Sequence, residues 1–477
     1  MRRLDPVLAL LPVIAGLAVA AYGRSNLEEK QARSYAAFKE YLQVGRMLSE
    51  GKPRRQAAQR FLELANSYPD TERGVLSKEL GLLLDKMADE DENFQPPADL
   101  AELSEEQRIH HYVFKLRDIA DHDTSVPGSC NVIRDARVPD SPAVALRKMG
   151  KPAVPALIEL LDDLRPTRSV GAPLNGAQVL RYCDAALQIL EVITGQRFGK
   201  LNARNALADR GSYLSNIKPE YRSQIISGIK TWWQKNQYKS EDQWIRNALS
   251  EMGIGTMWDR TEISRRLIEL QGDQSTSFFR ERLKQEPDNP WAVSLLWEAG
   301  GKAVIEDIRP KVHHEDFYVR TAAYRALVEA GDSNIADTII QDLHRALQQA
   351  DEKPFYHRAL ISVLAQGSEE KAVLAAARCI LHQNQIVAES TMIAFQTALQ
   401  RGNEPSPELR RVVFPYMAAV LDNEDLKYWA AWWLINAGQI PFEYVSDEKS
   451  VAERDRMIQQ IKLWWQEHKD EYPHREP

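Results

Sequence analysis

Apolar residues recur along most of the chain at intervals of three and four positions, as they do on one face of an α-helix. Few stretches alternate apolar and polar residues in the manner of a half-buried strand. Residues that favour helices, including Ala, Leu, Glu, Gln and Arg, are present throughout. The pattern therefore predicts an all-α protein.

In the C-terminal half this helical pattern repeats about every 35 residues. Five glycines, spaced by 31, 36, 35 and 36 residues, follow the apolar stripes: Gly300, Gly331, Gly367, Gly402 and Gly438. The residue eight positions before each glycine is an alanine: Ala292, Ala323, Ala359, Ala394 and Ala430. The positions seven, four and three before each glycine are apolar too, and these four offsets share one helix face. Each glycine is expected to end its helix in the left-handed conformation.

Two segments resemble HEAT repeats, the two-helix units of α-solenoids. DFYVRTAAYRALVEAG (316–331) has the Asp316, Val319-Arg320, Ala323 and Leu327 spacing of that family. SPAVALRKMGKPAVPALIELLDD (141–163) has its helix–GKPAVPAL–helix form, with one helix ending at Gly150 and the next beginning at Pro152. The resemblance implies an α-solenoid of stacked HEAT-like repeats over most of 141–470, with a gap around 196–260.

The N-terminal region also has a helical pattern. Residues 56–87 predict two antiparallel helices joined at Tyr68-Pro69-Asp70, because Pro69 cannot continue the first helix. This stretch resembles a single tetratricopeptide-like hairpin, although it lacks the aromatic and Gly positions of that family. Four segments are expected. They are 1–24, a signal peptide or membrane anchor; 25–125, a helical region with the hairpin; 126–240, a first HEAT-like block; and 241–477, a second block with a C-terminal cap.

Residues 1–24 have the pattern of an export signal. Arg2 and Arg3 precede 16 uncharged residues, and Ala18-Val19-Ala20 supplies an A-x-A-like cleavage site. A signal peptide fits this pattern; an uncleaved anchor and an apolar start buried in a soluble fold are the alternatives. Either membrane-directed interpretation makes the rest of the chain extracytoplasmic, that is, periplasmic or secreted, because the two arginines favour staying inside.

A tryptophan-rich octapeptide occurs twice, as IKTWWQKN (229–236) and IKLWWQEH (461–468). Adjacent side chains on a helix diverge by about 100°, so a Trp pair cannot form one flat stacking surface. One Trp of each pair is therefore expected in the core and the other at its edge. We interpret both helices as caps closing solenoid blocks at about 237 and 468, since a polar stretch follows each. A platform for a sugar or a partner is the alternative.

We expect Ile229, Ile461, Trp232 and Trp464 to be largely buried. Helical spacing places each isoleucine on the same face as the Trp three positions later. The position of Ile226 slightly favours Trp233 as the deeper Trp of its pair.

Composition narrows the range of partners. The net charge is −7 and no basic tract stands out, so nucleic acid is an unexpected ligand. The three cysteines, Cys130, Cys183 and Cys379, allow at most one disulfide, and we interpret them as buried free thiols.

The chain lacks the common nucleotide-binding, hydrolase and metalloprotease motifs. His110-His111 falls in a predicted helix, where adjacent side chains diverge. His314-Glu315 is the one His-Glu dipeptide, whereas HEAT-fold di-iron hydroxylases need several. The paired carboxylates, Asp162-Asp163 and those of 89–92, are expected to be solvated. No catalytic, cofactor-binding or metal-binding residue is therefore predicted, and no cofactor.

RPTRSVG (165–171) is expected to be a loop. Its arginines would either bind an anionic partner or pair with neighbouring carboxylates.

These observations predict an exported, non-catalytic HEAT-repeat scaffold that mediates protein–protein interaction, with a partner that the sequence does not identify. The first alternative is a HEAT-fold enzyme of the bilin-lyase-like or metal-hydroxylase type, because the GKPAVPAL form is shared with the bilin-lyase repeat class. The second is a cell-envelope carbohydrate-binding protein that uses some of the 11 tryptophans.

Overall fold

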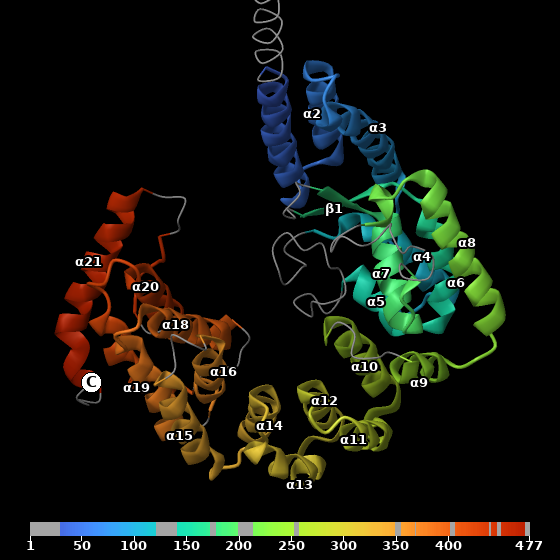
Figure 1. Cartoon of the computed structure of the whole chain (residues 1–477). Helices are drawn as coiled ribbons and strands as arrows, with labels where there is room; N and C mark the ends of the chain where they lie inside the picture. Colours follow the sequence, from blue (N-terminus) through green and yellow to red (C-terminus); the bar gives the residue numbers. More distant parts are fainter. Residues whose placement is uncertain are drawn as a thin grey trace, which may run out of the picture. The chain divides into compact units, whose positions relative to one another are not determined.

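The structure is a computed structural model that describes residues 29–120, 141–171, 178–198, 213–251, 257–348, 354–367, 369–400, 406–437, 440–445 and 450–472. It comprises two compact units, unit 1 (Met1–Leu267) and unit 2 (Ile268–Pro477). The described residues are mostly helical and include only two short strands, so the all-α prediction is confirmed (Figure 1).

The predicted segment boundaries at 125 and 240 both fall within unit 1, and they stay predictions. The apolar segment 1–24 lies outside the described residues. Within the described ranges, no helix combines the length and the apolar character that crossing a bilayer requires.

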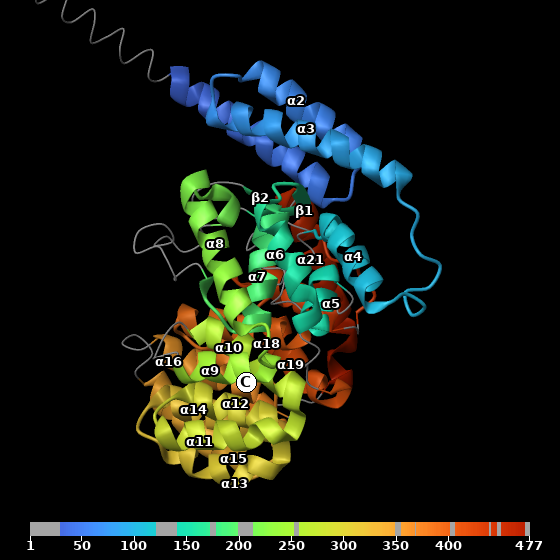
Figure 2. The same ribbon diagram turned by 90° about the vertical axis from the view of Figure 1, so that its right-hand side faces the viewer.

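Unit 1 begins with a layer of three helices: residues 29–49, α2 (Arg54–Ser67) and α3 (Glu72–Asn93). The last two lie side by side in Figure 2. Arg55, near the start of α2, pairs with Asp85 and Asp89 near the end of α3, which shows that the two helices are antiparallel as predicted. They approach closely at Gly81, where an added Cβ would lie 2.7 Å from Leu62 Cγ. The tight contact explains why a helix interior tolerates this glycine.

The rest of unit 1 surrounds α7, whose residues are buried on nearly every side. Its polar residues Asp184, Gln188 and Glu191 share one face, and even these are buried or half-buried. The remaining helices of unit 1 are α4 (Glu105–Lys115), α5 (Pro142–Met149), α6 (Val154–Glu159), α7 (Tyr182–Thr194), α8 (Pro219–Asn236), α9 (Glu241–Glu251) and α10 (Met257–Gln271), the last of which crosses into unit 2.

The segment predicted as an Arg-bearing loop is a strand. β1 (Pro166–Gly171) pairs antiparallel with β2 (Gln178–Arg181). Thr167 is buried, and its hydroxyl donates to the carbonyl of Leu180 at 3.0 Å. Val170 packs into the core of the three-helix layer. Pairing with β2 and burial against this layer, rather than local alternation, make this segment a strand.

The turn of the GKPAVPAL segment has the predicted form. α5 ends at Met149, and Gly150 has a φ of 67°, where glycine is favoured. A short 3₁₀ turn begins at Lys151 and leads into α6. An added Cβ on Gly150 would lie 2.2 Å from a carboxylate oxygen of Glu241. That carboxylate accepts from the backbone N–H of Lys151 and from Arg266 Nε, so the turn is joined to α9 and α10.

Unit 2 is a succession of helices (Figure 1). α12, α14, α16, α18 and α20 each contact the next helix of that series, and α15, α17 and α19 do the same. The helices are α11 (Thr276–Gln285), α12 (Pro290–Gly300), α13 (Ile305–Ile308), α14 (Phe317–Ala330), α15 (Ile335–Leu347), α16 (Pro354–Leu364), α17 (Glu370–Arg378), α18 (Gln385–Gln400), α19 (Pro407–Ala419), α20 (Lys427–Asn436) and α21 (Val451–His468).

Side-chain oxygens at four points satisfy backbone N–H groups where helices of the first series begin. Asp316 accepts from the N–H groups of Tyr318 and Val319, at 2.7 and 3.1 Å. The other residues that do this are Asn289, Asn384 and Asn423. Such residues satisfy donors that a helix start leaves unpaired, so they help to set where the helices begin.

The repeated alanines and glycines follow the prediction in part. Four of the alanines are buried, whereas Ala359 is half-buried. Gly331 ends α14 in the left-handed conformation, with φ 80°, as predicted. The prediction is wrong at Gly300, which has φ −120°, because the next residue, Gly301, has the positive φ instead. It is also wrong at Gly367, whose φ lies outside the left-handed range. Gly402 and Gly438 lie outside the described residues.

Candidate functional site

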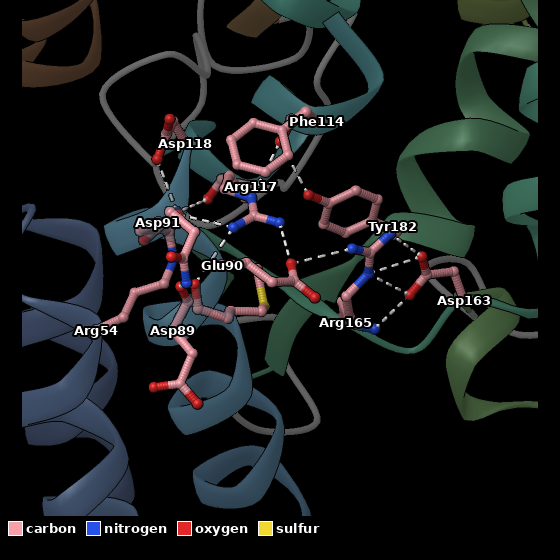
Figure 3. Close-up of polar contacts among 12 residues, drawn as sticks. Arg54, Asp89, Glu90, Asp91, Phe114, Arg117, Asp118, Asp163, Arg165 and Tyr182 are labelled. Atoms are coloured by element: carbon pink, nitrogen blue, oxygen red, sulfur yellow. Dashed lines mark hydrogen bonds and ion pairs between the residues drawn. The ribbon is translucent and has the colours of Figure 1, made fainter. Parts of the chain in front are cut away.

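A cluster of arginines and carboxylates joins the three-helix layer to the rest of unit 1 (Figure 3). We call it the arginine junction. Arg117, which follows α4 in a 3₁₀ turn (Leu116–Asp118), is 0% exposed and pairs with both Glu90 and Asp91 at the end of α3. Arg54 at the start of α2 is almost as deeply buried. It pairs with Asp91 and, at 2.7 Å, with Asp118. Two guanidinium groups thus share one carboxylate.

The junction continues to β1 and α7. Glu90 lies between Arg117 and Arg165 in Figure 3 and is 3.4 Å from Arg165 Nη1. Arg165 also holds both carboxylate oxygens of Asp163, at 2.6 to 3.1 Å. Its guanidinium lies 4.6 Å from the ring centre of Tyr182, the first residue of α7. The charged network therefore connects α3, the 3₁₀ turn, β1 and α7.

The buried charges of the junction stabilise one another. Burial disfavours ionisation of Asp118, but hydrogen bonds from Arg54 and Lys115 hold the pKa of that carboxyl below its ordinary value. Burial alone would lower the pKa of Arg117, and the neighbouring Tyr182, Asp91 and Glu90 raise it instead. Both groups stay ionised near neutral pH. Removing one partner of such a pair leaves an uncompensated buried charge, which costs about 3–5 kcal/mol.

This geometry suits structural support better than catalysis. Every carboxylate named in the junction is engaged by an arginine. A general base instead needs a carboxylate placed within reach of a substrate proton. The prediction of solvated carboxylates is wrong for Glu90, Asp91 and Asp163, and it holds for the exposed Asp162. It also holds for Asp89 and Glu92, which are exposed although both pair with Arg55. The burial of Arg54 and Arg117 was not foreseen, because helical spacing does not reveal a partner 26 to 64 residues away.

Of the two hypotheses for the arginines of 165–171, bridging to carboxylates is the one observed. Arg168 lies 3.7 Å from Asp118 and donates to the backbone carbonyls of Leu48 and Lys52, at 3.2 and 2.8 Å. Arg165 pairs with Asp163 and Glu90.

The two histidine pairs lie in different surroundings. His110 and His111 belong to α4 as predicted; His110 is exposed and lies 3.9 Å from Glu106, whereas His111 is half-buried. His314 is engaged at both ring nitrogens. Nε2 lies 2.9 Å from Asp288 Oδ1, and Nδ1 accepts from the N–H of Asp316 at 3.0 Å. His314-Glu315 is therefore an ordered turn between helices.

The described part of the chain contains no group of three or more His, Cys, Asp or Glu side chains arranged to hold a metal ion. Cys183 and Cys379 are buried and free, as predicted, while Cys130 lies outside the described residues. Burial raises the pKa of Cys379 to about 12 and raises that of Cys183 as well. Protonated thiols are poor nucleophiles, so these two cysteines act as small apolar groups.

The first octapeptide lies in α8. Ile226 and Ile229 are buried as predicted, but Trp232 and Trp233 are both half-buried, so the expected division into a core Trp and an edge Trp is wrong. The reason is Trp244 of α9, a buried ring that contacts both indoles edge-on, with centroids 5.5 and 5.8 Å away. The two diverging indoles therefore both contact the ring of Trp244, which lies between α8 and α9.

The second octapeptide lies in α21 and repeats this arrangement. Ile461 is buried, and Trp464 and Trp465 are both half-buried. Tyr472 takes the place of Trp244, with centroids 6.4 and 5.1 Å from the two indoles. In addition, His468 stacks on Trp464 at 4.4 Å with nearly parallel rings. Each Trp pair thus packs against an aromatic ring from a later part of the chain.

No protein-family model matches the chain, and no curated protein sequence is significantly similar to it.

Proposed function

We propose that the chain is an exported, non-catalytic scaffold, built as an α-solenoid of HEAT-like repeats, that binds a protein partner. The observation that carries the proposal is the order of helix contacts in unit 2. Alternate helices touch along two series, α12 to α20 and α15 to α19. Stacked two-helix units have such neighbour-to-neighbour contacts, and they offer long exposed faces that repeat proteins use for binding.

A polar link within unit 2 supports the HEAT-like interpretation of 316–331. Arg320 of α14 donates to the carbonyls of His314 and Glu315, at 2.6 and 2.9 Å, and pairs with the buried Asp342 of α15 at 3.2 Å. Tyr324 also donates to Asp342, at 2.8 Å. The Arg of the repeat thus joins its own helix to the preceding turn and to the following helix.

The non-catalytic part of the proposal rests on the arginine junction and the buried thiols. Glu90 and Asp91 neutralise the fully buried Arg117, and the two described cysteines are protonated near neutral pH. The export part rests on residues 1–24.

The direct test immobilises the full chain, cross-links it in membrane and periplasmic extracts and identifies the bound protein. A partner that forms a stoichiometric complex with the chain when both are purified is the expected result. Elemental analysis of the same preparation should show no stoichiometric metal. About one Zn or two Fe per chain, together with turnover of a substrate, would favour the HEAT-fold enzyme instead.

Export has its own test. A reporter fused to the C-terminus should be active only outside the cytoplasm, because the apolar segment directs the chain across the membrane. Replacing Leu10, Leu11, Val13 and Ile14 with charged residues should abolish that activity. Equal reporter activity in the cytosol would contradict the export proposal and leave the scaffold proposal untouched.

A further inference from the structure

The imidazole of His357 in α16 is buried without a hydrogen-bond partner. Its side chain is 0% exposed, and neither Nδ1 nor Nε2 meets a donor or an acceptor among the described residues. A neutral imidazole has one N–H to donate and one lone pair to accept, so both capacities are left unused. Buried polar groups in folded proteins are nearly always paired, so this position calls for an explanation.

The groups around this ring offer it no negative charge. Within the described part of the chain, the charged groups that act on His357 are His382, just after the 3₁₀ turn that precedes α18, and Arg358, the next residue of α16. Burial, followed by these two neighbours, lowers the pKa of His357. A proton on His357 would therefore be buried beside basic groups, with no carboxylate to compensate its charge.

The helices packed against α16 are α14, α15, α17 and α18, and their acidic side chains are engaged elsewhere or exposed. Those with other partners are Asp342 with Arg320 and Arg345, Asp337 with Lys371, Glu329 with Trp297, and Glu389 with Gln385. Glu370, at the start of α17, is exposed. The basic residues of these helices other than Arg320 are also exposed: Arg325, His344, Arg345, Lys371 and Arg378.

The two neighbours of α16 in the first series hold it differently. On the side of α14, the hydroxyl of Tyr356 accepts from Arg320, and its ring meets that of Phe317 edge-on, with centroids 4.0 Å apart. Within the described residues, no hydrogen bond or ion pair joins α16 to α18, so that contact depends on apolar packing. α16 is therefore expected to stay with α14 and to separate more readily from α18.

We propose that the contact between α16 and α18 is an acid-sensitive hinge, which opens when His357 takes up a proton. In the closed state the protonated ring would be buried near His382, whereas in the open state water can solvate it. Contacts in unit 2 run from neighbour to neighbour, so one of them can open while the helices on either side stay folded. The open state takes up the proton first, so opening is expected as the pH falls below the ordinary His pKa of about 6.5. The hinge goes beyond the proposed scaffold function and does not depend on which protein is bound.

The turn before α14 supplies a comparison within the same unit. His314 and His382 each lie three residues before a helix of the first series, and Nδ1 of each accepts from the backbone N–H two residues later, at 3.0 Å. Nε2 of His314 also lies 2.9 Å from Asp288 Oδ1. A protonated His314 would thus keep a carboxylate partner, whereas a protonated His357 would have none. Acid is therefore expected to open the contact between α16 and α18 and to leave α14 in place.

Hydrogen exchange of the full chain at pH 7.5 and 5.5, corrected for the intrinsic pH dependence of exchange, measures the opening. At pH 5.5 the amides of α16 and α18 should exchange faster by up to about tenfold, the limit for a ring that takes up its proton only when open. The amides of α14 and of unit 1 should not change. His357→Met should keep the protection of α16 and α18 equal at both pH values. The matched control is His344→Met in α15, which removes an exposed imidazole and should behave as the wild type.

His382→Asp tests the sign of the effect. A carboxylate near the ring favours the protonated imidazole, so this variant should lose the acid-induced opening. Its α16 and α18 should be protected at pH 5.5 at least as well as at pH 7.5. The Asp side chain can accept from the N–H of Asn384 in place of Nδ1, so the turn before α18 should keep its form.

Unchanged protection of the wild type at pH 5.5 would overturn the proposal, as would an equal acid response of the wild type and His357→Met. Protection lost throughout unit 2, or at the contact between α14 and α16 instead, would overturn it too. If His357→Met does not fold, the wild type and His382→Asp decide: an acid response of the same size in both contradicts the hinge.

Discussion

Helices α8 and α21 carry nearly the same octapeptide, and each buries its isoleucines while leaving both tryptophans half-buried. They differ in the aromatic ring that packs against the Trp pair. In α8 the closing ring is Trp244, which belongs to the next helix; in α21 it is Tyr472, the last residue that the structure describes. The exposed faces differ even more, since larger residues of α21 stand at the positions of three small residues of α8. Ser227, Gly228 and Thr231 correspond to Gln459, Gln460 and Leu463. Similar buried positions can therefore support unrelated surfaces.

The units that contain these helices also differ in charge. Unit 1 has 38 Lys and Arg against 35 Asp and Glu, a net charge of +3. Unit 2 has 23 against 33, a net charge of −10. Without residues 1–24, which hold three arginines and one aspartate, unit 1 has 35 Lys and Arg against 34 Asp and Glu, so unit 1 is nearly neutral and unit 2 is acidic. An acidic partner is therefore expected to be repelled by unit 2 more than by unit 1.

The largest effect is expected from Trp244→Ala. This buried ring contacts both Trp232 and Trp233, so its removal leaves a cavity between α8 and α9 and should cost about 3–5 kcal/mol. Hydrogen exchange should show lost protection over 219–251 and native protection in unit 2. Native protection at α8 would mean that the shared ring does not support the Trp pair.

Tyr472→Ala makes the corresponding change at α21 and should cost less, about 2 kcal/mol. The ring stacks on Phe414 at 4.9 Å and contacts Trp465, but it follows a short 3₁₀ turn, whereas Trp244 lies within a helix. Protection should be lost at α21 and α19 and kept in α14. A loss as large as that of Trp244→Ala would show that both Trp pairs depend equally on their third ring.

Acid should weaken unit 2 through His357 of α16. This imidazole is 0% exposed, and neither ring nitrogen has a hydrogen-bond partner among the described residues. Burial, followed by the charges of His382 and Arg358, lowers its pKa. The unfolded state then takes up the proton first, so stability is full above the ordinary His pKa of about 6.5 and falls as the pH drops below it.

The measurement is a urea titration at pH 7.5 and 5.5, with about 1 kcal/mol expected from this group. His357→Met, which copies the buried Met392 of α18, should remove that part of the acid loss. His344→Met is the control, because His344 of α15 is exposed. Equal acid sensitivity of the wild type and His357→Met would contradict the assignment.

The smallest effect concerns the residue four positions after the first Trp of each pair. His468 stacks on Trp464, whereas Asn236 donates to the carbonyl of Trp232. His468→Asn should destabilise α21 by about 0.5–1.5 kcal/mol through loss of the stacked pair. Asn236→His should quench the fluorescence of Trp232, with little change in the thermal midpoint. An unchanged midpoint for His468→Asn would show that the stacking is incidental.

Local sequence signals predicted the helices well. Pro69 separates α2 from α3, Gly150 ends α5, and Asp316 caps α14. Each of these depends on residues within a few positions of one another, where backbone chemistry decides. The glycine column was less reliable, because Gly300 is followed by a second glycine that takes the positive φ.

Distant partners account for what was missed. β1 is a strand because β2 and the three-helix layer cover it, and Arg54 and Arg117 are buried because Asp91 lies opposite them. Nothing in the local spacing of 165–171 or 89–92 distinguishes these outcomes from a solvated loop. The half-buried state of both Trp pairs likewise depends on rings 7 to 12 residues later in the chain.

The sequence by itself determined which segments are helices and which of their faces are apolar, because propensity, caps and periodicity act over a few residues. Tertiary structure alone decided which charges are buried and which indoles share a ring. Those features require residues of different elements to meet. Burial energies depend on the groups that meet there, and composition and spacing do not specify those groups.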